Sequence, residues 1–140
     1  MKVPALHPPA PSERHADDDI DVASLIESAQ HHAFGYCEAA TDPASGLVLD
    51  STQPDSPCSI TGVGMALATY PVAVERGWLT RTQAVGITLK TLRLFAQADM
   101  SGSPQAAGHR GFYYHFLDMH SGTRAWKSEL SSIDTAFLIA

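Results

Sequence analysis

Apolar residues recur every three or four positions along much of this 140-residue chain. In residues 22–38 the recurring positions are Val22, Leu25, Ile26, Ala29, Ala33, Tyr36 and Cys37. In residues 81–98 the positions expected to face inward are Val85, Thr88, Leu89, Leu92, Phe95 and Ala96. This spacing is typical of helices that bury one face. The pattern therefore predicts a mainly α fold.

Short polar signals mark where these helices begin and end. Asp21 and Ser59 can each accept a hydrogen bond from the free amides of a following first turn. Thr80 and Gln83 have the spacing of a capping box. Gly77 suits the left-handed residue that follows a helix.

A further helix is predicted over residues 60–76, and it is rich in small residues. Gly62 and Gly64 would let another helix approach closely, at a cost in helix propensity. Pro71 lies within the same segment and predicts a kink or a break there.

The pattern changes to a period of two near the C-terminus. Residues 111–118 are strongly aromatic, as strands are, and residues 123–127 can return as a second strand. Ser131 or Ser132 can then cap a last helix, with Asp134 in its first turn. The expected fold therefore has about four helices and one β-hairpin.

Composition excludes several classes of protein. A hydrophobic share of 44% is enough for one folded domain and argues against a disordered chain. The net charge of −6 disfavours a nucleic-acid partner, which needs a basic stripe. No apolar run approaches the roughly 18 residues of a membrane span, so no membrane partner is expected.

No metal or cofactor is expected either. His31 and His32 are adjacent and lack the i, i+4 spacing of a helical metal pair. Cys37 and Cys58 have no partner at metal-binding spacing and do not make a disulfide framework. The sequence also contains no Gly-x-Gly-x-x-Gly run and no phosphate loop.

Residues 1–21 are rich in proline and aspartate and are predicted to form a leader without structure. Residues 3–8 do not supply the apolar stretch of about 7–15 residues that a secretory signal needs. A cytosolic chain is therefore the default expectation.

Three stretches outside this leader resemble a known family. They read TDPASGLVLDSTQPDSPCSITGVGMAL from Thr41, YPVAVERGWLTRTQAV from Tyr70 and GFYYHFLDMHSGTRAWKSELSSIDTAFLIA from Gly111. In these stretches the chain resembles bacterial glycoamylase-like glycoside hydrolases, which are related to endo-β-1,2-glucanases. The third stretch is the longest and the most specific.

The resemblance implies the N-terminal third of an (α/α)6 toroid, with residues 22–140 as an incomplete domain. Stacked helical units leave an open apolar edge where neighbours are missing. We therefore expect either a piece of a longer protein or a chain that self-associates through that edge. Relatives of this family are often periplasmic or secreted. The implied partner is an oligo- or polysaccharide.

Glycosidic bond cleavage normally uses two carboxyl groups. The resemblance places the segment with Glu129 and Asp134 at the substrate site, which makes these two residues the catalytic candidates. Asp134 matches an acidic position of related β-1,2-glucanases, and Glu129 does so only loosely. The alternatives are a carboxylate at a helix N-terminus for Asp134 and a structural salt bridge or hydrogen bond for Glu129.

Six further residues are candidates for sugar binding, namely Asp118, His115, Tyr114, Trp126, Asp55 and Ser59. Aromatic rings can stack on the apolar face of a sugar, and polar side chains can bond its hydroxyls. Turn formation by Asp118, core packing by the aromatic residues and helix capping by Ser59 are the alternatives.

Overall fold

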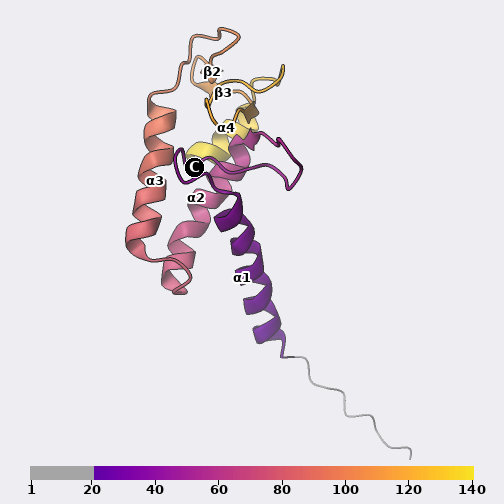
Figure 1. Cartoon of the computed structure of the whole chain (residues 1–140), viewed down its shortest axis with the longest axis vertical. Helices are drawn as coiled ribbons and strands as arrows, with labels where there is room; N and C mark the ends of the chain where they lie inside the picture. The colour runs from indigo at the N-terminus through magenta and orange to yellow at the C-terminus, as the bar shows by residue number, and fades with distance from the viewer. Residues whose placement is uncertain (1–20) are drawn as a thin grey trace, which may run out of the picture.

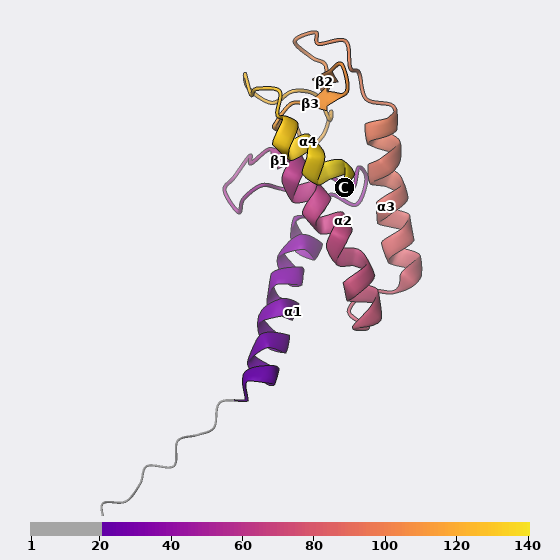
Figure 2. The same cartoon turned by 180° about the vertical axis from the view of Figure 1, so that it is seen from behind.

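The computed structural model describes residues 21–140 and shows four helices (Figures 1 and 2). The helices are α1 (Val22–Ala40), α2 (Ile60–Glu75), α3 (Arg81–Ala96) and α4 (Ser132–Ile139). The strands are β1 (Cys58–Ser59), β2 (Gly108–His109), β3 (Phe112–Tyr113) and β4 (Phe116–Leu117). The mainly α class is confirmed. Apart from Asp21, the predicted leader lies outside the described residues.

The predicted helix signals act as expected. The Asp21 carboxylate accepts from the backbone amide of Ala23, and Ser59 caps α2. Thr80 and Gln83 form the predicted capping box, and Gly77 has a φ of 74°. The helix bounds follow from these local bonds.

Of the two alternatives predicted at Pro71, a break is excluded, because helix α2 continues through the proline to Glu75. A prediction about α3 is wrong in part. Phe95 of α3 is buried, as predicted. Val85, Leu89 and Leu92 were also expected to face inward, yet all three are exposed. Helix α3 instead packs through other residues, including Thr91, whose buried hydroxyl bonds to the carbonyl groups of Ile87 and Gly46. Because threonine is polar, the spacing of apolar residues does not identify this face of α3 as the buried one.

The predicted return of residues 123–127 is present as a short antiparallel contact, in which the amide of Ala125 donates to Phe116 and that of Asp118 donates to Thr123. The aromatic segment also makes a pairing that was not predicted. Strand β3 pairs with β2 across a tight turn at Arg110 and Gly111, both at positive φ. Two-residue turns of this kind match the twist of a hairpin and usually have Asn, Asp or Gly at the first position. Arginine stands there in this chain, so the sequence did not indicate the turn. The segment 123–127 contributes one bridge, between Leu117 and Arg124.

Strand β4 takes its partner from far away in the sequence. It pairs antiparallel with β1, so that Leu117 lies opposite Cys58 and Phe116 lies opposite Ser59. Since Ser59 also caps α2, this pairing fixes the C-terminal third of the chain against the start of that helix.

Helix α2 is the centre of the core, and α4 crosses its N-terminal half in both views (Figures 1 and 2). A Cβ atom added to Gly64 would lie 2.2 Å from the carbonyl oxygen of Phe137 and 2.9 Å from the Cα of Leu138. The close approach expected from the small residues of α2 is therefore confirmed at Gly64.

We predict that Gly64→Ala lowers the free energy of unfolding by about 1–3 kcal/mol, because the backbone of α4 has to move. Gly86→Ala on α3 is the matched control, since an added Cβ meets no atom within 4 Å. The control is expected to gain up to about 1 kcal/mol from helix propensity. Urea unfolding followed by circular dichroism measures both, and equal behaviour of the two variants would contradict the prediction.

Candidate functional site

The predicted catalytic carboxyls converge on one histidine. The Nδ1 atom of His115 lies 3.0 Å from Oε1 of Glu129 and 3.6 Å from Oδ2 of Asp134. The second oxygen of Asp134 accepts a hydrogen bond of 2.5 Å from the hydroxyl of Thr61. We call His115, Glu129 and Asp134 the histidine–carboxylate cluster.

Backbone bonds between distant segments hold this cluster together. The amide of Ile60 donates to the carbonyl of His115 at 3.1 Å. The amide of His115 donates to the carbonyl of Glu129 at 2.9 Å. The amide of Ser131 in turn donates to the carbonyl of Tyr113 at 3.0 Å. The segment from 113 to 115 is therefore bonded to the start of α2 and to the entry of α4.

The two carboxyls differ in exposure. The Asp134 side chain is 17% exposed and that of Glu129 is 70% exposed. Burial alone would raise the pKa of Asp134, but hydrogen bonds with Ser131 and Thr61 and the nearby His115 lower it below its ordinary value. The pKa of Glu129 is lowered mainly by its own backbone amide and by the hydrogen bond with His115.

Both groups are therefore carboxylates at neutral pH. A glycosidase acid must hold its proton, which requires a raised pKa. The cluster is consequently arranged to accept protons or hydrogen bonds and to stabilise positive charge. The structure brings the two candidates together, and their catalytic role stays a prediction.

A polar hollow of about 400 Å³ lies between two loops near this cluster. Its lining includes Asp55 from the first loop and Asp118, Arg124 and Trp126 from the second. The structure thus brings three predicted sugar-binding residues to one place. We call these four residues and the space between them the polar hollow.

An aromatic row joins the cluster to the polar hollow. The His115 ring stacks on the Phe116 ring with 3.9 Å between centroids. The Trp126 ring meets Phe116 edge-on at 5.4 Å. These ring contacts connect the histidine–carboxylate cluster to the polar hollow.

Tyr114 and Ser59 have structural surroundings. Tyr114 is 6% exposed, and the Arg124 guanidinium lies 4.1 Å from its ring centroid. Ser59 is also buried, and its hydroxyl caps α2. Both residues therefore offer little surface to a sugar, and their predicted contacts remain untested.

Sequence reasoning missed Thr61, Phe116 and Arg124. Thr61 is separated from Asp134 by 73 positions, so no local pattern links them. Phe116 and Arg124 lie in the two predicted strands, where a structural role accounted for them. The likeness of that segment to the glycan-acting family was the available signal.

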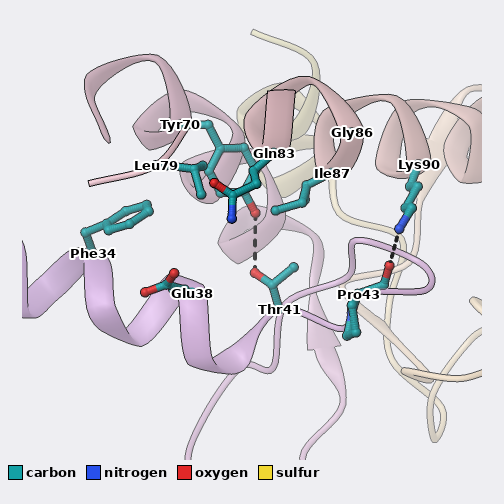
Figure 3. Close-up of a pocket in the computed structure, with 10 residues that line it drawn as sticks. All are labelled: Phe34, Glu38, Thr41, Pro43, Tyr70, Leu79, Gln83, Gly86, Ile87 and Lys90. Carbon is teal, nitrogen blue, oxygen red and sulfur yellow. Dashed lines mark hydrogen bonds between the residues drawn. The ribbon is translucent and has the colours of Figure 1, made fainter. Parts of the chain in front are cut away.

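A second cavity, of about 340 Å³, lies between α1 and α3 (Figure 3). Phe34 and Ile87 give it apolar walls, while Tyr70 bonds to Thr41 at 3.3 Å. Glu38 is the only carboxylate among the residues that line it. This cavity therefore lacks the paired carboxyls of the cluster.

Two further classes of site were sought within residues 21–140. No helix there has the length and hydropathy needed to cross a membrane. No three His, Cys, Asp or Glu side chains in the same range are placed to hold a metal ion.

Comparison with family models and with curated proteins gave no match for this chain. Solved structures do resemble it. A proposed glucoamylase from Bacteroides uniformis matches with a TM-score of 0.68 and 24% identity, over 83% of this chain and 28% of that structure. An endo-β-1,2-glucanase from Chitinophaga pinensis, in complex with sophorotriose and glucose, matches with a TM-score of 0.68 and 20% identity.

The chain has part of a glucoamylase-like fold. This confirms the fold expected from the resemblance. The glucanase match covers 83% of this chain and 29% of that structure. The chain therefore spans less than a third of the length of the glucoamylase-like structures that it matches.

We predict that Thr61→Val raises the pKa of Asp134, because the hydroxyl bonds to the ionised form. It should also lower stability at neutral pH by about 1.5 kcal/mol. A lowered folded-state pKa stabilises the fold above the unfolded-state pKa, and this contribution is lost as pH falls through the folded value. The stability difference from the unmodified chain should therefore shrink in acid.

The matched control is Thr69→Val on the same helix, where the hydroxyl donates to the backbone carbonyl of Ala66. This change should leave the pKa of Asp134 unaltered. Carboxyl-detected NMR titration measures the pKa directly. An unchanged Asp134 titration in Thr61→Val would show that this hydrogen bond does not act on the carboxylate.

Proposed function

We propose that this chain supplies part of the active site of a carbohydrate-active enzyme, a glycoside hydrolase or transglycosylase that acts on a β-glucan. The observation that carries the proposal is the convergence of Glu129 and Asp134 on His115. The glucoamylase-like fold supports it, and the glucanase match favours a β-1,2-linked substrate.

The two carboxylates have separate roles in this proposal. Glu129 is exposed and can reach a bound sugar or a water molecule as base or nucleophile. Asp134 is mostly enclosed and holds His115 in place while stabilising positive charge near the sugar. Because the pKa of each is lowered, we assign neither of these two carboxyls as the proton donor.

We further propose that the chain works as a portion of a longer protein. Helix α1 presents Val22, Leu25 and Ile26 to solvent with 60%, 59% and 52% exposure. On α4, Ile133 and Ile139 are 69% and 73% exposed. Apolar helix faces of this kind usually have a partner. The 140 residues alone should be weakly active or inactive, since an open cleft does not fix the reacting groups.

In the product of the full reading frame that contains this sequence, Glu129→Gln is expected to slow the release of reducing sugar from β-1,2-glucan. The loss should be about 10²–10⁴-fold, the usual contribution of a proton-transfer group. Glu38→Gln on α1 is the matched control and should retain activity, because Glu38 lies in the other cavity. Full activity of Glu129→Gln would refute the catalytic role.

The second candidate function is a non-catalytic sugar-binding module or a self-associating fragment. The exposed faces of α1 and α4 favour it, because a second copy could cover them. It predicts that the 140-residue chain forms dimers or larger species whose fraction rises with concentration.

Sedimentation velocity over a wide concentration range tests this candidate. Leu25→Lys should weaken the association, since it places a charge in the apolar face of α1. Ser28→Lys on the same helix is the control. A compact monomer at every concentration would exclude self-association.

A further inference from the structure

Trp126 combines two unfavourable features. Its side chain is 71% exposed, although tryptophan is usually mostly buried. Its backbone has a φ of 53°, in the left-handed region that bulky residues rarely occupy. Its ring meets Phe116 only by an edge. Packing against other residues of this chain therefore gives no reason for a tryptophan at position 126.

A second strained residue faces the same space. Three residues other than glycine have positive φ within the described range, and they are Asp55, Arg110 and Trp126. Asp55 and Trp126 both line the polar hollow, although 71 positions separate them in the sequence. Strained residues that gather around one cavity point to a functional site.

The polar hollow holds both donors and acceptors. The Asp118 oxygen Oδ1 is used by the turn at Ser121, and within residues 21–140 no bond is made by Oδ2. Arg124 donates through Nε to the carbonyl of Ser128 and its guanidinium lies over the Tyr114 ring, while its two terminal amino groups make no hydrogen bond within that range. Asp55 adds an exposed carboxylate.

This chemistry fits a neutral sugar. An exposed indole offers a flat apolar face, which suits the C–H face of a pyranose ring. Two carboxylates and one guanidinium can bond several hydroxyl groups at once. Two carboxylates face one arginine here, and His120 is the other titratable side chain of the lining, so the site has no excess of fixed positive charge to favour an anion. A volume of about 400 Å³ is within the range of small-molecule sites.

We propose that the polar hollow is a glucan-binding subsite, in which one pyranose ring stacks on Trp126 and bonds to Asp55, Asp118 and Arg124. The inference rests on the proposed carbohydrate function but not on catalysis by Glu129. The row formed by His115, Phe116 and Trp126 makes the subsite continuous with the histidine–carboxylate cluster. The bound sugar would be a unit adjacent to the bond that is cut.

The test is a titration of the 140-residue chain with a linear β-1,2-linked gluco-oligosaccharide, followed by calorimetry and by the indole N–H signals in NMR. Binding should shift the Trp126 signal and leave that of Trp78 in place. Trp126→Ala should weaken binding at least about tenfold, which corresponds to about 1.4 kcal/mol. An unchanged affinity in Trp126→Ala, or no shift at Trp126 with saturating sugar, would overturn the proposal.

Trp126→Gly guards against loss of fold, because glycine accepts the left-handed backbone. It should melt at the same or a higher temperature than the unmodified chain and still lose binding at least about tenfold. Arg110→Gly is the matched control at the third strained residue, and it should retain full affinity. Loss of affinity in Arg110→Gly, or retained affinity in Trp126→Gly, would count against the subsite.

Glu129→Gln separates this inference from the proposed function. The subsite predicts that Glu129→Gln binds the oligosaccharide with its Trp126 shift intact, whether or not catalysis is lost. If that variant binds sugar at Trp126 while the full enzyme keeps its activity, the subsite holds and the catalytic proposal fails. If activity depends on Glu129 but the sugar never reaches Trp126, the catalytic proposal holds and the subsite fails.

Discussion

The backbone contact between Gly64 of α2 and Phe137 of α4 determines how the rest of the site is built. Thr61 lies about one helical turn before Gly64, and Asp134 lies about one turn before Phe137. Close approach of the two backbones at the crossing therefore brings the two helix beginnings together. The hydrogen bond from Thr61 to Asp134 follows from that approach. A side chain at residue 64 would separate the helices and lengthen this bond.

The start of α4 also explains how a mostly enclosed carboxylate stays charged. Removing a carboxylate from water is costly unless donors replace the lost solvent. Asp134 occupies the first turn of α4, where the helix dipole favours negative charge. Thr61 and Ser131 supply hydrogen bonds, and His115 adds a third polar neighbour. The helix start and the distant Thr61 thus stabilise the Asp134 carboxylate, which lies beside the exposed carboxylate of Glu129.

The parts of the fold that depend on neighbours in sequence were predictable. Asp21, Ser59, Ser131 and the pair Thr80 and Gln83 each act within three residues, and the structure confirms them. Pairing over long distances was not predictable from one sequence. Nothing local places β4 opposite β1, so the aromatic segment looked like one strand of a hairpin.

The inward face of α3 shows a related difficulty. This helix has two stripes that could be buried, and the more apolar one is exposed in this chain. The buried stripe includes Thr91, whose polarity is satisfied by carbonyl oxygens of Gly46 and Ile87. Hydrophobic periodicity identifies an amphipathic helix, but it does not show which of its faces packs against the rest of the chain.

The proposed binding and the proposed catalysis would depend on different parts of this molecule. The loop that carries Trp126 is held by backbone bonds, such as those from Ala125 to Phe116 and from Asp118 to Thr123. These bonds do not involve α4. Asp134, by contrast, lies on a short helix with one face packed on α2 and several apolar side chains exposed. Covering the exposed side chains of α4 would stabilise the helix that carries Asp134 and leave the polar hollow unchanged. Under the proposed function, binding of a glucan by these 140 residues without its cleavage is therefore physically consistent.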